Sequence, residues 1–191
     1  MEIPAVTGGQ VLDALRDAFY QIVPLDYKTH CALTARICCR VLRRFGIEAH
    51  LEPCQLWWVA PGRNFIVGFF RKAHELQWEG HVVCRGEGFL IDAALYHVQR
   101  ELGVEVPKIV AADVFDFRSN VISRYDLSHD TRLWWHRPPP DVDIEIPGEP
   151  QELIARYSDE LISKLALDLG IDGRLSAQLV PAEWQSVPSF Y

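Results

Sequence analysis

The feature that most constrains the fold is a change of hydrophobic pattern at Gly46. Before this glycine, apolar residues recur at the three- and four-residue spacing of amphipathic helices, whereas after it they fall in short runs between turn residues, as in strands. A further helical pattern lies near the end of the chain. Because helices and strands are segregated along the chain instead of alternating, the order predicts an α+β fold rather than a doubly wound sheet.

The pattern predicts two helices in the first part of the chain. The first helix begins after Thr7, which has capping-box spacing to Gln10, and ends before Pro24. The second helix spans residues 30–45, with Thr29 as its N-cap. Its apolar stripe is broad, so we expect the second helix to be well buried.

Five strand-like runs follow, and proline and glycine residues at turn positions separate them. The runs cover residues 47–51, 55–60, 65–70, 80–85 and 88–92. A short helix is expected from Ala93 to Leu102, and residues 104–136 carry no pattern that assigns an element.

The pattern also predicts how the chain is divided. Residues 1–136 form the core, residues 137–150 form a linker rich in proline and acidic residues, and residues 151–191 form a C-terminal helical extension. Leucine and tyrosine side chains recur every four residues from Leu153 to Leu169. We expect this helix to pack back on the core, because an isolated helix would expose its whole stripe.

Composition narrows the functional classes. The chain has 191 residues, 49% of them hydrophobic, and a net charge of −7, so it can bury a sizeable core but lacks the basic excess of nucleic-acid-binding proteins. No secretion signal or membrane-spanning run is visible, and the five cysteines show no disulfide framework. We therefore expect a cytoplasmic protein with reduced thiols, no nucleic-acid or membrane partner, and an oligomeric state that the sequence does not define.

Cys31 is placed differently from the other four cysteines. It lies in the first turn of the second predicted helix. There the free backbone N–H groups and the helix dipole favour a thiolate, which is the nucleophilic form of cysteine, and can hold an oxyanion in front of the helix. The alternative is a small buried thiol, which is the common role of a single cysteine.

The segment from Gly80 to Asp92 reads as a tight hairpin. A two-residue turn at Gly86-Glu87 would place His81 directly opposite Asp92, on the same face of the hairpin. A carboxylate beside a histidine fixes its tautomer and stabilises the imidazolium, which a general base for a thiol requires. The alternative is an ordinary polar pair on a solvated face.

Two stretches resemble bacterial transglutaminase-like proteins. One is Cys31-Ala-Leu-Thr-Ala with the later run Leu42-Arg-Arg-Phe-Gly-Ile-Glu-Ala, which is similar to the nucleophile helix and the strand after it. The other combines Gly80-His-Val-Val with Phe89-Leu-Ile-Asp-Ala-Ala, which is similar to the strands that carry the histidine and the aspartate. The resemblance covers residues 25–95. It implies a papain-like fold with the nucleophile helix packed on an antiparallel sheet, Cys31 as nucleophile, His81 as general base and Asp92 as the residue that orients His81.

Some positions depart from the family pattern. Val83 stands where an aromatic residue is usual, and the interval from His81 to Asp92 is shorter than is common. The sequence before Cys31 has neither the Arg-Gly-Gly of arylamine N-acetyltransferases nor the Asp-Cys-Ser of cell-wall endopeptidases. The superfamily is therefore a better assignment than any of its members.

Three further features leave alternatives open. Tyr27 is the candidate for a second oxyanion donor, with Gln21 and Gln55 behind it. In the pairs Trp57-Trp58 and Trp134-Trp135, at most one member should face the core, and the outward members could line a cleft. A zinc site is the remaining chemical option, built from the side chains of His30, Cys31, Cys54, His81 and Cys84.

The sequence therefore supports two main functional hypotheses. The first is a cysteine peptidase, amidase or transglutaminase-like acyltransferase that acts on an amide, ester or thioester of a peptide or small acyl substrate, with no cofactor. The second is a non-catalytic binding module that keeps the papain-like fold and uses its tryptophan-rich face. Exposure of Cys31, and its distance from His81, separate the two.

Overall fold

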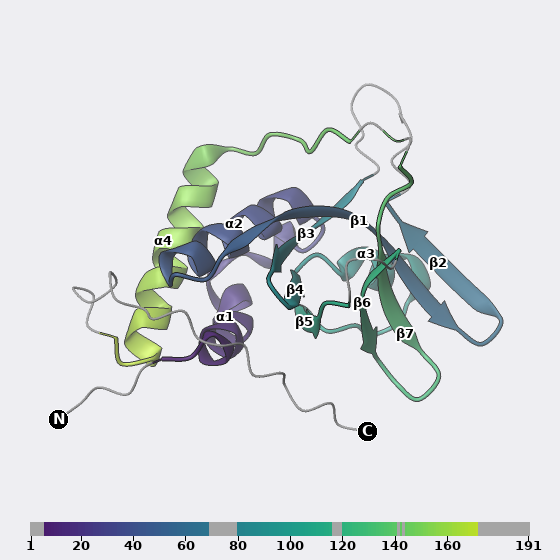
Figure 1. The fold of residues 1–191 in the computed structure, drawn as a ribbon, viewed down its shortest axis with the longest axis horizontal. Coiled ribbons are helices and arrows are strands. Elements are labelled where there is room, and N and C mark those ends of the chain that lie inside the picture. Colours follow the sequence, from purple (N-terminus) through teal and green to yellow (C-terminus); the bar gives the residue numbers. More distant parts are fainter. Residues whose placement is uncertain (1–5, 69–79, 116–119, 141, 143, 172–191) are drawn as a thin grey trace.

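Three helices form one layer of the molecule, and a curved antiparallel sheet lies beside them (Figure 1). The computed structural model describes residues 6–68, 80–115, 120–140, 142 and 144–171. The helices are α1 (Gly8–Ile22), a 3-10 helix (Leu25–Tyr27), α2 (Cys31–Arg44), α3 (Tyr96–Leu102) and α4 (Gln151–Asp168). The strands are β1 (Ala49–Ala60), β2 (Arg63–Val67), β3 (His81–Gly86), β4 (Phe89–Asp92), β5 (Val110–Asp113), β6 (Val121–Asp126) and β7 (Arg132–His136). The expected α+β class is confirmed.

The sheet is nearly closed into a barrel. Its strand order is β5-β4-β3-β1-β7-β6, with β2 paired to β1, and each pairing is antiparallel. A bridge between Val114 and Ser123 brings the β5 end of this order to the β6 end. The Ser123 hydroxyl strengthens the closure by donating to the Asp113 carbonyl oxygen at 2.6 Å.

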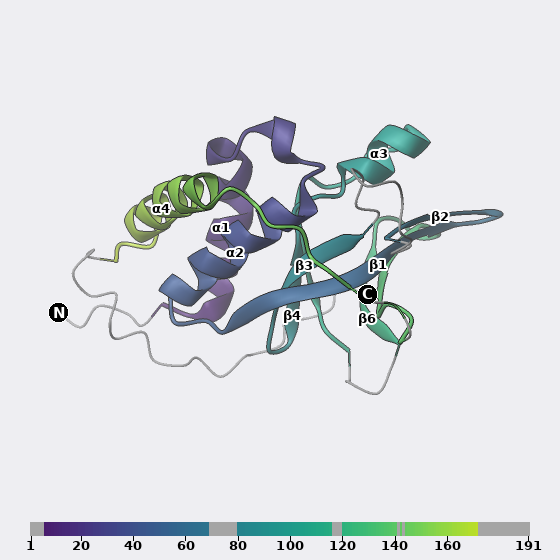
Figure 2. The same ribbon diagram turned by 90° about the horizontal axis from the view of Figure 1, so that it is seen from above.

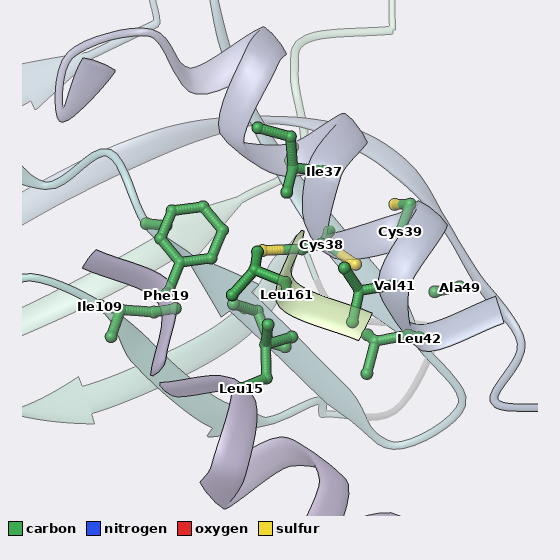
Figure 3. Packing of buried hydrophobic residues seen from close by; sticks show 14 of the residues in the cluster. Leu15, Phe19, Ile37, Cys38, Cys39, Val41, Leu42, Ala49, Ile109 and Leu161 are labelled. Atoms are coloured by element: carbon green, nitrogen blue, oxygen red, sulfur yellow. The ribbon is translucent and has the colours of Figure 1, made fainter. Parts of the chain in front are cut away.

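The two faces of β3 and β4 belong to two hydrophobic clusters. One cluster lies between the sheet and helices α1, α2 and α4, and Figure 3 shows Leu15, Phe19, Ile37 and Leu161 meeting there. The other cluster lies on the opposite face, inside the barrel, where α3 contributes Val98. Both faces of these strands are therefore buried, so the histidine–aspartate pair does not lie on a solvated face.

The predicted start of α1 is confirmed, and that of α2 is wrong by one residue. Thr7 and Gln10 form the expected capping box. The N-cap of α2 is His30, because a hydrogen bond from its N–H to the Tyr27 carbonyl oxygen extends the 3-10 turn up to that residue. Thr29 does not cap α2, and Cys31 is the first helical residue.

The two strands expected at residues 47–51 and 55–60 are replaced by one strand, β1, which begins at Ala49 and runs through Pro53. Among the described strands, the first half of β1 pairs with β3 alone, and its second half pairs with β2 and β7. Pro53 lies where a single partner strand is present, so the side of the strand without a partner needs no N–H donor. The turn prediction at Pro53 failed for this reason.

The hairpin of β3 and β4 is shifted by two residues from the predicted register. Arg85 pairs with Leu90 instead of Gly88, so the turn is formed by Glu87 and Gly88, and Gly88 has a φ of 89°. A shift of two residues keeps every side chain on its face. His81 and Asp92 therefore still share a face, but as diagonal neighbours.

The C-terminal helix packs against α1 and α2. Its buried residues follow the expected four-residue spacing through Tyr157, Leu161 and Leu165, and Gly170 ends it with a φ of 65°. The rest of the predicted extension, residues 172–191, lies outside the described residues, as do Phe69 and Phe70 of the third strand-like run. In the described part of the chain, no helix has the length and apolar character needed to cross a membrane.

Candidate active site

Three elements bring the predicted site residues to the junction between the helical layer and the barrel. Cys31 is the first residue of α2, His81 is the first residue of β3 and Asp92 is the last residue of β4. Figure 2 shows α2 beginning beside the barrel and running away from it. The site therefore combines one residue of the helical layer with two residues of the sheet.

His81 and Asp92 form a buried hydrogen-bonded pair. The Nε2 atom of His81 lies 2.6 Å from Oδ2 of Asp92, and the two side chains expose 0% and 1% of their surface. The same Oδ2 accepts the indole N–H of Trp135 at 2.8 Å, and Oδ1 accepts the backbone N–H of Ala94 at 2.9 Å. The carboxylate thus has three donors, which together fix its orientation and that of the imidazole.

These contacts keep the pair charged. Burial on its own would raise the pKa of Asp92, but the positive charge of His81 and the three hydrogen bonds lower it below its ordinary value. Burial would likewise lower the pKa of His81, but Asp92, with a smaller contribution from Cys31, raises it to about 10. The raised pKa of His81 and the lowered pKa of Asp92 favour an imidazolium at neutral pH with a carboxylate as its counter-ion.

Cys31 interacts with this histidine. The Cys31 sulfur contributes to the raised pKa of His81, so the two groups are close enough to interact. The Nδ1 atom of His81 is nevertheless buried, without a hydrogen-bond partner among the described residues, and the thiol points to the Gly80 carbonyl oxygen at 4.0 Å. Since Nε2 is held by Asp92, Nδ1 is the atom left to exchange a proton with the sulfur.

Cys31 lines a pocket of about 590 Å³. The start of α2 forms one wall of the pocket, the end of β2 forms another, and α3 and the segment before α4 complete it. The lining residues are Thr29, His30, Cys31, Ala32, Phe65, Ile66, Val67, Gly68, Gly80, His97, Arg100, Glu101, Pro147 and Glu149. Cys31 exposes only 6% of its surface, so the thiol lies at the base of this pocket and not on an open face.

Gly68 allows β2 to end directly against the histidine. A Cβ atom at this position would lie 2.7 Å from the Cys54 carbonyl oxygen and 3.1 Å from both Cβ and N of His81. Its φ of 90° is also in the region that favours glycine. The position of His81 therefore depends on a close backbone approach that only glycine permits.

Two residues of the site were not predicted from the sequence. Trp135 reaches Asp92 from β7, and the alternation rule correctly indicated that one member of the Trp134-Trp135 pair faces inward, although nothing in the sequence gave its partner. His97 lines the pocket and makes a 2.8 Å hydrogen bond with the Thr29 carbonyl oxygen. Burial is the main cause that lowers the pKa of His97, and no motif surrounds this residue.

The candidate oxyanion donors of the sequence do not line this pocket. The ring of Tyr27 packs against His30 and Tyr157, with centroid distances of 5.4 and 5.8 Å. Gln21 donates to the Asp17 carbonyl oxygen on an exposed face, and Gln55 accepts from Trp57. The backbone N–H of Cys31 remains a donor of the required kind, because the first N–H groups of a helix have no acceptor within it.

The structure also bears on the tryptophan pairs and on the zinc alternative. Trp58 and Trp135 are buried, whereas Trp57 and Trp134 are paired on the outer face of the sheet, beside His136 and away from the Cys31 pocket. For the zinc alternative, the described residues contain no group of three or more His, Cys, Asp or Glu side chains that could hold a metal ion.

The chain was also compared with known proteins. No protein-family model, curated protein or solved structure matches it. What this protein does must therefore be inferred from the geometry of the site.

Proposed function

We propose that this protein is a cysteine-dependent hydrolase or acyltransferase that acts on an amide, ester or thioester. The observation that carries the proposal is the buried 2.6 Å contact between His81 and Asp92, which leaves Nδ1 of His81 without a partner among the described residues, while Cys31 is close enough to His81 to affect its pKa. An ion pair that only stabilises the fold does not require its histidine to keep one ring nitrogen available near a thiol at the base of a pocket. The arrangement supports Cys31 as nucleophile, His81 as base and Asp92 as the orienting residue.

The reaction follows from these positions. The Cys31 thiolate attacks the acyl carbon of the substrate, and the N–H groups at the start of α2 stabilise the oxyanion. The imidazolium of His81 gives its Nδ1 proton to the leaving amine, alcohol or thiol, which leaves the acyl group on the sulfur as a thioester. Neutral His81 then takes a proton from water or an amine, which attacks the thioester and releases Cys31.

A papain-like, transglutaminase-like fold is part of this proposal. A helix that begins with the nucleophile and packs on an antiparallel sheet, with the histidine and the aspartate on neighbouring strands, is what the sequence resemblance implies. The pocket beside Cys31 has a volume of about 590 Å³, which suits a peptide segment or a small acyl group. The proposed reaction requires no cofactor.

The test is site-resolved labelling of the native protein with iodoacetamide at pH 6. An imidazolium beside the sulfur favours the reactive thiolate, so Cys31 is expected to react at least about tenfold faster than Cys38 and Cys54. Those two cysteines are internal controls, because burial raises their pKa well above the ordinary value. The His81→Ala variant should remove the advantage of Cys31.

An unreactive Cys31, or equal labelling in the His81→Ala variant, would contradict the proposed mechanism. If the variant fails to fold, the labelling rate of Cys31 in the native protein, measured against that of free cysteine at the same pH, still decides the matter. A reactive Cys31 then justifies a screen with activated esters, thioesters and glutamine-containing peptides.

One observation favours a second function, a binding module without catalysis. Cys31 exposes only 6% of its surface, whereas a nucleophile must meet its substrate. In that case Trp57 and Trp134, paired on the outer face of β1 and β7, would form the contact surface. The labelling experiment separates the two functions, because a binding module has no need of an activated thiol.

A further inference from the structure

A second pocket lies on the other side of α2, between this helix and the start of α4. Its volume is about 590 Å³, and none of its residues lines the pocket of Cys31. The residues that line it are Arg36, Cys39, Arg40, Arg43, Leu51, Gln151 and Ile154. It therefore combines three cations with a thiol.

The three arginines occupy successive turns of one face of α2. Arg40 pairs with Asp159 at 3.2 Å. Arg36 and Arg43 each donate to a backbone carbonyl group, and within the described ranges neither pairs with a carboxylate. The Nε atom of Arg36 is buried and has no hydrogen-bond partner there. A buried donor without an acceptor is costly, so this pocket suits an anionic ligand.

Cys39 lines this pocket, and a second thiol lies behind it: Cys84 does not line the pocket but pairs on β3 with Leu51, which does. Cys39 belongs to α2 and Cys84 to β3, and both are part of the cluster between the helices and the sheet. Figure 3 shows Cys39 at the edge of this cluster, whereas Cys38 points into it. The interaction with Cys84 is the largest cause that lowers the pKa of Cys39, burial opposes it, and the charges of Arg43 and Arg36 add to it. Burial raises the pKa of Cys84.

We propose that this pocket is a thiol–disulfide exchange site, separate from the Cys31 site, that takes a small disulfide carrying carboxylate groups. Cys39 is the attacking thiol, and Cys84 is the resolving thiol. The arginines hold the carboxylates of the incoming disulfide, which brings its sulfur atoms to the Cys39 thiol.

The exchange consists of two displacements. The Cys39 thiolate attacks one sulfur of the small disulfide, the disulfide bond breaks, and one small thiolate leaves and takes up the proton that Cys39 gave up. Cys84 then loses its proton to the second leaving thiolate as it attacks the Cys39 sulfur. The protein is oxidised by two electrons to a Cys39–Cys84 disulfide, and the small disulfide is reduced to two thiols.

The Cys39–Cys84 disulfide would also connect the two layers of the molecule. It would link α2 to β3, which are the elements that begin with Cys31 and His81. The exchange site does not depend on the chemistry of Cys31, so the two proposals succeed or fail separately.

The test compares three disulfides of different charge on the reduced full-length protein at pH 7. The probes are oxidised glutathione (anionic), 2-hydroxyethyl disulfide (neutral) and cystamine (cationic), each normalised to its rate with free cysteine. Site-resolved mass spectrometry is expected to show Cys39 reacting roughly tenfold faster with oxidised glutathione than with cystamine. It should also show a Cys39–Cys84 cross-linked peptide in the native protein.

Three variants complete the test. Cys84→Ser should accumulate the mixed disulfide at Cys39. Arg43→Gln should remove most of the charge preference, whereas Arg44→Gln, which changes net charge equally on the next residue of α2, should keep it. An unreactive Cys39, equal normalised rates for the three probes, or no cross-linked peptide would overturn the proposal. The probe comparison uses the native protein, so a variant that fails to fold does not weaken it.

Discussion

Asp92 is the residue on which the candidate active site depends most. Its carboxylate accepts from a side chain of β3, a side chain of β7 and the backbone of Ala94, and it exposes 1% of its surface. With both oxygens used as acceptors, only the ionised form suits its surroundings. The charge of Asp92 in turn keeps His81 protonated, and so determines what His81 can do for Cys31.

The first prediction at this scale concerns Asp92→Asn. An amide cannot accept at both oxygen positions, so at least one of the three donors loses its acceptor and His81 loses its counter-ion. We expect the free energy of unfolding to fall by about 3–5 kcal/mol, as is typical when one partner of a buried pair is removed. Labelling of Cys31 at pH 6 should fall at least about tenfold, to the rate of an ordinary thiol.

Asp113→Asn is the matched control, because Asp113 is an exposed carboxylate on β5, the strand next to β4. It should leave the stability and the labelling rate of the protein almost unchanged. Equal effects of the two substitutions would contradict the role given to Asp92. Denaturant unfolding and site-resolved labelling measure both quantities.

At the scale of elements, local patterns predicted well what depends on neighbouring residues. The capping box of α1, the stripe of α4 and the shared face of His81 and Asp92 follow from spacing alone. The register of the hairpin did not, because either Gly86 or Gly88 can supply turn chemistry. The structure uses Gly86 for a close approach instead: a Cβ there would lie 2.1 Å from the Phe89 ring.

Contacts between distant elements were beyond local patterns. Trp135 is 43 residues from Asp92, and His97 is 68 residues from Thr29. The strands that complete the barrel lie in residues 104–136, where no periodicity assigned an element. Pro53 was taken as a break because proline removes a donor, whereas its effect depends on which neighbouring strands are present.

The second prediction concerns the end of β2. Gly68→Ala places a methyl group against the backbone that carries His81, so we expect a destabilisation of about 1–3 kcal/mol and a slower labelling of Cys31. Gly62→Ala is the matched control, since Gly62 has a similar φ of 71° with nothing within 4 Å of the added Cβ. If Gly62→Ala slows the labelling as much as Gly68→Ala does, strain alone explains the effect, and the contact with His81 has no separate role.

At the scale of the whole molecule, the candidate site lies across a boundary. Cys31 belongs to the helical layer, whereas His81 and Asp92 belong to the barrel, and α2 packs against β3 and β4. The distance between the Cys31 sulfur and the His81 imidazole therefore depends on how the helical layer packs against the barrel. The charge on the His81–Asp92 pair also contributes to the stability of the whole fold.

The third prediction is a pH dependence of stability. The pKa of His81 is raised from 6.5 to about 10, so its contribution is complete below pH 6.5 and is lost as pH rises toward 10. The pKa of Asp92 is lowered from 3.8, so its contribution is present above pH 3.8 and is lost as pH falls below this value. The pair should therefore stabilise the protein most between these two ordinary values.

Thermal unfolding at several pH values tests this expectation. The difference in Tm between the native protein and the double variant His81→Gln, Asp92→Asn should be largest near pH 5 and should shrink steadily from pH 7 to pH 10. The double variant lacks the charges of this pair but keeps all the other titrating groups, so the effect of those groups cancels in the difference in Tm. A difference that grows with rising pH would contradict the raised pKa of His81.

The hydrogen bond from Trp135 to Asp92 gives this protein a built-in optical sensor. An indole whose N–H is held by a carboxylate emits differently when that carboxylate or the neighbouring imidazolium changes its charge. Trp135 is one of six tryptophans, so its signal is the difference between the emission of the native protein and that of Trp135→Phe. Acylation of Cys31, or any ligand that alters the proton on His81, could then be followed in real time without a label.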